Sequence, residues 1–230
     1  MSQTSTATLG FATACTVLTA GRAAFFGDDT RDLPVRASQL LREDDRTPSF
    51  GFVGPRFAEH RVLFMGINPG NGARNDARTD DDNIMMPKLR TFAETPSPET
   101  WAGASAAYAK ACVRWPVWKR HCAFIIGDRP LLGLDEIAYT NALPWRTASN
   151  AAFGDDIARN AARLFAKPFI EELKPKVIVA LGKRANEILS HAGRLPDTKI
   201  FVWDRSQAAT PNVVAGRKRM ADEIRRYLAG

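Results

Sequence analysis

The 230-residue sequence contains few cysteines and lacks several common ligand-binding patterns. Its three cysteines include no CxxC pair, so they provide neither a disulfide framework nor a complete zinc or iron-sulfur ligand set. We therefore expect a cytoplasmic protein without a metal or other cofactor. The phosphate-loop patterns GxxxxGK[ST] and GxGxxG are also absent, which argues against an unrelated nucleotide-binding α/β protein.

Long apolar runs are missing as well. The segment Thr8 to Ala20 is too short and too rich in threonine to span a bilayer, and no Lys or Arg precedes it as in a secretory signal. It predicts an N-terminal helix lying on the core, and no membrane partner is expected. The formal net charge of +7 favours polyanions, so nucleic acid is a natural partner.

Four short apolar runs predict buried strands, at residues 61–65, 137–140, 177–181 and 199–203. Helical patterns separate or follow them, at residues 97–115, 155–173, 184–189 and 221–228, whereas residues 71–83 predict a long polar loop. This alternation predicts an α/β fold, with three α/β/α layers around a central, mostly parallel four-stranded sheet. We expect one domain over residues 1–230, with residues 1–58 as an N-terminal helical and loop extension packed on it.

The carboxyl ends of parallel strands are where such folds place their sites. Gly66-Ile67-Asn68-Pro69-Gly70 directly follows the first predicted strand, and Asn68 there either projects a free amide or bonds its own backbone in an Asx-turn. Tyr139-Thr140-Asn141 ends the second strand with another amide. A third unit, the run PKVIVALGKRA over residues 175–185, follows about thirty residues later.

This order of motifs resembles the uracil-DNA glycosylase superfamily over roughly residues 60–215. The GINPG turn is most similar to the mismatch-specific and single-strand-selective branches, and the VIVALG unit looks more like the iron-sulfur branches. The resemblance implies that Asn68 positions the attacking water and that Gly66, Ile67, Pro69 and Gly70 shape the pocket floor. It also implies that Asn141 reads the base, because an amide satisfies the O4 acceptor and the N3 donor of uracil together.

The sequence departs from the family in three ways. The H-P-S motif that supplies a histidine after the last strand is absent, so the stabiliser of the leaving base is either missing or is Arg205, Ser206 or a backbone amide. The cysteine expected after the strand-end Asn is replaced by Trp145, which argues against a cluster. No aromatic residue obviously stacks on the base, and Phe92 is our candidate.

The expected activity is hydrolysis of the N-glycosidic bond of a flipped base in DNA, without lyase chemistry, by a monomer. Uracil is the first candidate base, and hypoxanthine, xanthine or a mispaired thymine are alternatives. A non-catalytic lesion-binding protein is a further alternative. Phosphate contacts are predicted for five basic residues near the sheet edge, which are Lys183, Arg184, Arg217, Lys218 and Arg219. Each is equally well explained as a solvated helix charge.

Overall fold

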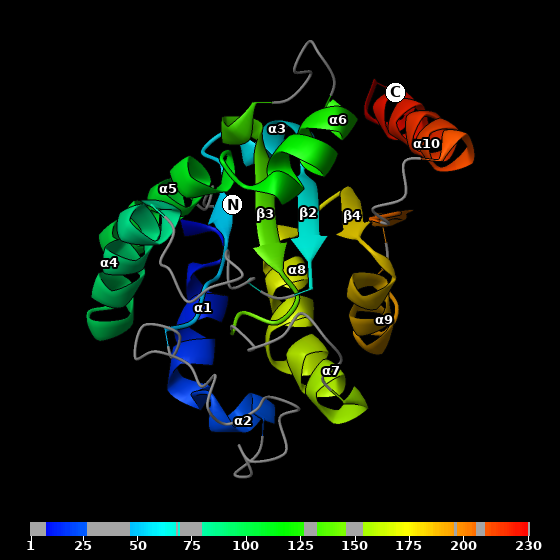
Figure 1. Cartoon of the computed structure of the whole chain (residues 1–230). Coiled ribbons are helices and arrows are strands. Elements are labelled where there is room, and N and C mark those ends of the chain that lie inside the picture. Colours follow the sequence, from blue (N-terminus) through cyan, green and yellow to red (C-terminus); the bar gives the residue numbers. More distant parts are fainter. Residues whose placement is uncertain are drawn as a thin grey trace.

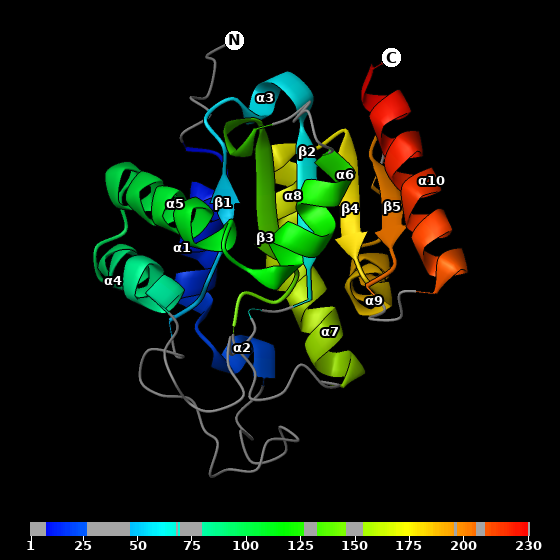
Figure 2. The same cartoon turned by 45° about the horizontal axis from the view of Figure 1, so that its top comes forward.

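The structure, a computed structural model, describes residues 8–26, 47–67, 69, 80–126, 133–145, 154–195, 197–205 and 210–229. Within these ranges the chain forms one five-stranded sheet in the order β1-β3-β2-β4-β5 (Figure 1 and Figure 2). Its strands are β1 (Phe52–Val53), β2 (Val62–Gly66), β3 (Ile137–Asn141), β4 (Val177–Leu181) and β5 (Lys199–Trp203). The fold is therefore mixed α/β.

Strands β2 to β5 lie where the apolar runs predicted them, and they pair with one another in parallel. The prediction of four strands was wrong by one, because β1 pairs antiparallel with β3 at the edge of the sheet. A strand of two residues is too short to show the sequence pattern from which strands are predicted. Gly51 permits the approach of β1, since its φ is +86° and a Cβ there would overlap the Tyr139 carbonyl oxygen. Residues 52–53 thus belong to the sheet itself.

Helices pack on the sheet from several sides (Figure 2). Before β3 the chain forms α1 (Phe11–Ala20), α2 (Ala23–Phe26), α3 (Phe57–His60), α4 (Asp80–Glu94), α5 (Pro98–Cys112), the π-helical turn η4 (Trp118–Cys122), α6 (Ala123–Ile126) and the 3-10 turn η5 (Leu134–Glu136). After β3 it forms α7 (Asp155–Ala161), the π-helical turn η6 (Ala162–Ala166), α8 (Lys167–Leu173), α9 (Lys183–His191) and α10 (Pro211–Ala229).

Most predicted helices are confirmed, with changed boundaries. Helix α5 begins after Ser97 with a capping box and a proline in its first turn, and the run α7-η6-α8 ends at Leu173 as expected. The predicted loop 71–83 was wrong at its end, because α4 begins at Asp80; the acidic run there favours a helix N-terminus. Helix α10 starts ten residues earlier than predicted, at Pro211, a residue suited to the first helical position.

Helix α1 lies on the core, as predicted for the N-terminal segment. Its Ala14 and Val17 side chains are fully buried. Glu172 of α8 accepts hydrogen bonds from the Gly10 and Thr13 backbone N–H groups at 2.7 and 3.0 Å, and from the Thr13 hydroxyl at 2.6 Å. This carboxylate caps the start of α1, where Gly10 offers no capping side chain. None of the described helices has both the length and the apolar character needed to cross a membrane.

Candidate functional site

The ends of β2 and β3, which carry the two amide motifs, lie side by side. Gly66 is the register partner of Asn141, although 75 positions separate them in the chain. Beyond the strands the contact continues, because the Ala142 N–H donates to the Gly66 carbonyl and the Leu143 N–H donates to the Ile67 carbonyl, both at 2.9 Å. The GINPG turn and the strand-end Asn therefore begin at one edge of the sheet.

Gly66 leaves the space that the Asn141 side chain occupies. A Cβ at Gly66 would overlap Asn141 Oδ1 and would lie 3.2 Å from the Tyr139 hydroxyl. The conformation of Gly66 does not require glycine, so the requirement is steric. Any larger residue at this position must displace the amide.

The Asn141 side chain is held in a defined orientation. It is 3% exposed, and its Nδ2 donates to the hydroxyl of Tyr108 on α5 at 3.2 Å. The neighbouring Tyr139 stacks on Phe52, with ring centroids 6.4 Å apart. Burial raises the pKa of Tyr139 well above its ordinary value, so its phenol stays neutral. The amide therefore lies among uncharged hydrogen-bonding groups.

The remaining predicted pocket residues are only partly covered by the structure. Ile67 is half-buried and Pro69 is buried beside the end of β2. Asn68, Gly70 and Ser206, the other predicted residues of the pocket and of the leaving-group site, lie outside the described residues. Their predicted roles remain predictions.

Phe92, the predicted stacking residue, lies in the core. It is 0% exposed on α4, and its ring contacts Phe11, Phe50 and Trp101 at centroid distances of 6.2, 5.9 and 5.4 Å. A base could stack on this ring only after the surrounding aromatic side chains had separated. The observed role of Phe92 is packing.

Arg205 follows β5 and lies against a neighbouring strand end. Its aliphatic carbons come within 3.6 Å of the position that a Cβ on Gly182 would take, and the φ of Gly182 is +104°. Its positive charge acts on His121, Cys122 and Tyr139. The guanidinium of Arg205, which follows β5, therefore interacts electrostatically with a residue of β3.

His121 is a buried polar residue of this same edge. It is 8% exposed, and its Nδ1 accepts a hydrogen bond from Trp203 Nε1, at the end of β5, at 3.1 Å. The neutral ring therefore carries its proton on Nε2. Burial, together with the guanidinium groups of Arg205, Arg217 and Arg120, lowers the pKa of His121 to about 4. Nothing in the local sequence indicates this pairing, which is formed across 82 positions.

The predicted phosphate-binding residues lie at the first turn of α9 and the early turns of α10. Lys183, Lys218 and Arg219 are exposed, whereas Arg184 pairs with Glu187 at 2.9 Å and Asp155 at 3.6 Å. Arg217 Nε donates to the Asp204 carbonyl at 3.0 Å. Arg217 and Arg219 also line an open hollow of about 500 Å³ between Asp204 and α10, together with the acidic Glu223. Of this group, Arg184 thus forms ion pairs with acids among the described residues.

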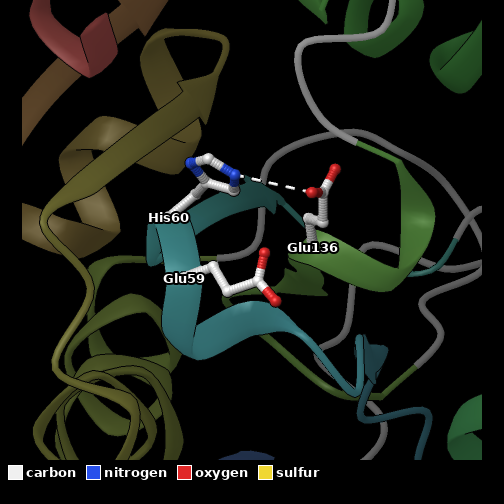
Figure 3. A group of neighbouring side chains, drawn as sticks. All are labelled: Glu59, His60 and Glu136. Atoms are coloured by element: carbon white, nitrogen blue, oxygen red, sulfur yellow. Dashed lines mark ion pairs between the residues drawn. The ribbon is translucent and has the colours of Figure 1, made fainter.

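A group of potential metal ligands lies at the opposite end of the sheet. Glu59, His60 and Glu136 place ligand atoms within 4.8 Å of one another (Figure 3). Arg56 already pairs with Glu59 at 2.8 Å and with Glu136 at 2.7 Å, and its side chain supplies the positive charge that these acids need. Since α3 precedes β2 and η5 precedes β3, the group is at the amino ends of the strands and is separate from Asn141. Its arrangement is that of an ion-pair network.

No known protein-family model matches the chain, and no curated protein matches it significantly.

Proposed function

We propose that this protein is a monofunctional DNA glycosylase of the uracil-DNA glycosylase type, with three α/β/α layers. One observation supports this most directly. The GINPG turn and Asn141, which the family resemblance assigns to water positioning and base recognition, originate from adjacent strand ends, joined through Gly66. Parallel strands with helices on them place this pair at the carboxyl edge, where α/β folds bind ligands.

The proposed reaction needs no cofactor. Water adds to C1′ of the deoxyribose while the bond from C1′ to the base nitrogen breaks, and the base leaves with the electron pair of that bond. The water loses a proton, and the products are an abasic sugar and the free base. Asn68 places the water, since an uncharged amide binds it without needing a shifted pKa. Extrusion of the base from the helix precedes this step and costs a few kcal/mol.

Asn141 supplies base selectivity in this proposal. With one Nδ2 hydrogen bound by Tyr108, the second N–H and Oδ1 remain to pair with O4 and N3–H of uracil. Cytosine presents the reverse pattern of donor and acceptor, so it leaves both amide atoms facing the wrong partner. The contact to Tyr108 supports recognition because it ties the buried Asn141 side chain to α5.

Stabilisation of the departing base is assigned to the β5 end. Arg205 provides a cation there, and Ser206 follows it in the chain. His121 is a further donor candidate, because its neutral ring carries the proton on Nε2 and it shares Arg205 as an electrostatic neighbour with Tyr139. Donors fixed before the reaction stabilise developing negative charge without reorganisation. DNA phosphates are assigned to Lys183, Arg184, Arg217, Lys218 and Arg219.

The test is release of free base from oligonucleotides that carry uracil, hypoxanthine, xanthine or a mispaired thymine, in single and double strands. We expect uracil release by the wild-type protein, and loss of roughly two to three orders of magnitude in rate for Asn68→Ala. If only another base is released, the glycosylase proposal holds with a changed substrate. If no base is released while lesion-selective binding persists in both proteins, the chain is a lesion-binding protein and the enzymatic proposal is wrong.

A further inference from the structure

Near the carboxyl end of β3, two buried polar side chains have no hydrogen-bond partner among the described residues. Trp145 is 4% exposed and Ser49 is 2% exposed. Neither Trp145 Nε1 nor Ser49 Oγ has a partner in the part of the chain that the structure describes. Buried polar atoms are nearly always paired in folded proteins, so two such atoms on adjoining segments require an explanation.

These side chains belong to one piece of structure. The Ser49 N–H donates to the carbonyl of Pro144, the residue before Trp145, at 2.7 Å. One residue further, the Thr140 hydroxyl donates to the Phe50 carbonyl at 2.7 Å. Residues 49–50 therefore run beside the end of β3, and Trp145 lies four positions after Asn141. Both unpaired donors are at the edge of the sheet that carries the proposed site.

Two other buried tryptophans, Trp101 and Trp203, do satisfy their indole N–H. Trp101 Nε1 donates to the Leu9 carbonyl at 3.1 Å, and Trp203 Nε1 donates to His121 Nδ1 at 3.1 Å. The fold can thus pair a buried indole where only packing is required. At Trp145 the ring packs against Phe25, with centroids 6.2 Å apart, while its donor is left unused.

We propose that Trp145 Nε1 and Ser49 Oγ bind an acceptor oxygen of the nucleotide whose base is excised. This inference rests on the proposed function. An indole N–H is only a donor, and a serine hydroxyl donates readily, so the ligand atom is an acceptor, and in a uracil nucleotide the acceptors are oxygens. Such oxygens are present in a DNA phosphate and in a base carbonyl. Binding of the oxygen supplies the hydrogen bonds that these two positions do not find among the described residues.

The first experiment observes the indole directly. Protein labelled with 15N-tryptophan is titrated with three probes: an oligonucleotide with a tetrahydrofuran abasic site, free uracil, and an unmodified oligonucleotide of the same sequence. The Trp145 signal is assigned from its absence in Trp145→Phe. We expect it to shift downfield, with the Trp101 signal unchanged. A shift with the abasic strand identifies a phosphate as the source of the oxygen, and a shift with free uracil identifies the base. A Trp145 signal that moves with neither of these probes overturns the inference.

The second experiment separates binding from structure. Trp145→Phe keeps the ring and removes the donor, and Ser49→Ala removes the hydroxyl. For base release we expect KM to rise about tenfold for each variant with kcat within about twofold, as for a uniformly bound group. The melting temperature should not fall, because each variant loses an unpaired buried donor. The control Trp101→Phe loses a satisfied bond, so its melting temperature should fall while KM stays unchanged.

The two proposals fail in different ways. A wild-type protein that releases no base contradicts the proposed function, yet the indole titration still reports whether an oligonucleotide or base binds at Trp145. A wild-type protein that releases base, with Trp145→Phe and Ser49→Ala matching it in KM, contradicts the inference alone. If these two variants have a lowered melting temperature and an unchanged KM, the inference is contradicted as well, since both side chains then contribute to packing and not to binding.

Discussion

Gly66 lies where the two predicted motifs meet, and its lack of a side chain leaves room for Asn141. Because a Cβ there would overlap Asn141 Oδ1, Gly66→Ala should displace the amide while leaving the strand pairing possible. We expect a lower melting temperature and a loss of base release of at least about tenfold, since misplaced groups cost rate steeply. Calorimetry and base-release assays on the same preparation measure both effects.

The matched control is Gly103→Ala. Gly103 lies inside α5, and a Cβ there has no neighbour within 4 Å. Alanine at such a position should raise the free energy of unfolding by roughly 0.5–1 kcal/mol, because it restricts the unfolded chain. If both alanine variants behave alike, the Asn141 side chain does not require a glycine at position 66.

The contact between Tyr108 and Asn141 gives a second prediction at the scale of a residue. Tyr108→Phe removes the hydroxyl that accepts a hydrogen bond from Asn141 Nδ2. It keeps the ring that packs against Trp115, with ring centroids 5.1 Å apart. We expect kcat/KM for uracil to fall about tenfold, and discrimination against cytosine to fall with it, because the Asn141 side chain is then held less firmly. Competition between uracil and cytosine oligonucleotides measures the discrimination. The control is Tyr227→Phe, an exposed tyrosine on α10.

Among helices and strands, the attachment of α1 through Glu172 is the feature most open to test. Glu172→Ala removes a carboxylate that accepts from two backbone N–H groups and one hydroxyl. Charge-assisted bonds of this kind are each worth about 1.5–3 kcal/mol, so we expect a loss of at least about 2 kcal/mol in the free energy of unfolding.

Its neighbour on α8 provides the control. Glu171 is exposed and pairs only loosely with Lys167, at 3.9 Å. Glu171→Ala should change the free energy of unfolding by less than about 0.5 kcal/mol, since exposed ion pairs contribute little. Urea titration of both variants decides the matter: equal effects would mean that α1 is held by its apolar residues rather than by the carboxylate.

The sequence was most informative for elements buried on every side. Strands β2 and β4 are continuous apolar runs, and such runs have few alternatives to the inside of a parallel sheet. Strand β1 could not be predicted, because its two residues pair only through contacts with β3 that are distant in sequence. The same limit applies to the site. Asn141 follows a predictable strand, whereas the pairing of His121 with Trp203 and the unpaired Trp145 donor arise from tertiary packing.

At the scale of the whole molecule, His121 makes stability depend on pH. Its pKa is lowered from the ordinary 6.5 to about 4, mainly because burial disfavours the charged ring. Between these values the unfolded chain binds a proton that the folded protein does not, so acidification favours unfolding. The contribution of neutral His121 to stability is therefore complete above pH 6.5, decreases as the pH falls, and is lost below about pH 4.

The variant His121→Gln tests this dependence because a glutamine oxygen can still accept the Trp203 N–H, and the amide does not titrate. We expect the difference in unfolding free energy between wild type and variant to shrink steadily from pH 7 to pH 4 in urea titrations. The carboxylates of the protein also titrate in acid, but they are common to both proteins and cancel in the difference. His191→Gln, at an exposed histidine of α9, controls for loss of an imidazole without burial. If the wild type and His121→Gln lose stability in parallel over this range, then His121 is solvated when the protein is folded, and its assignment as a neutral Nε2 donor at the carboxyl edge fails with it.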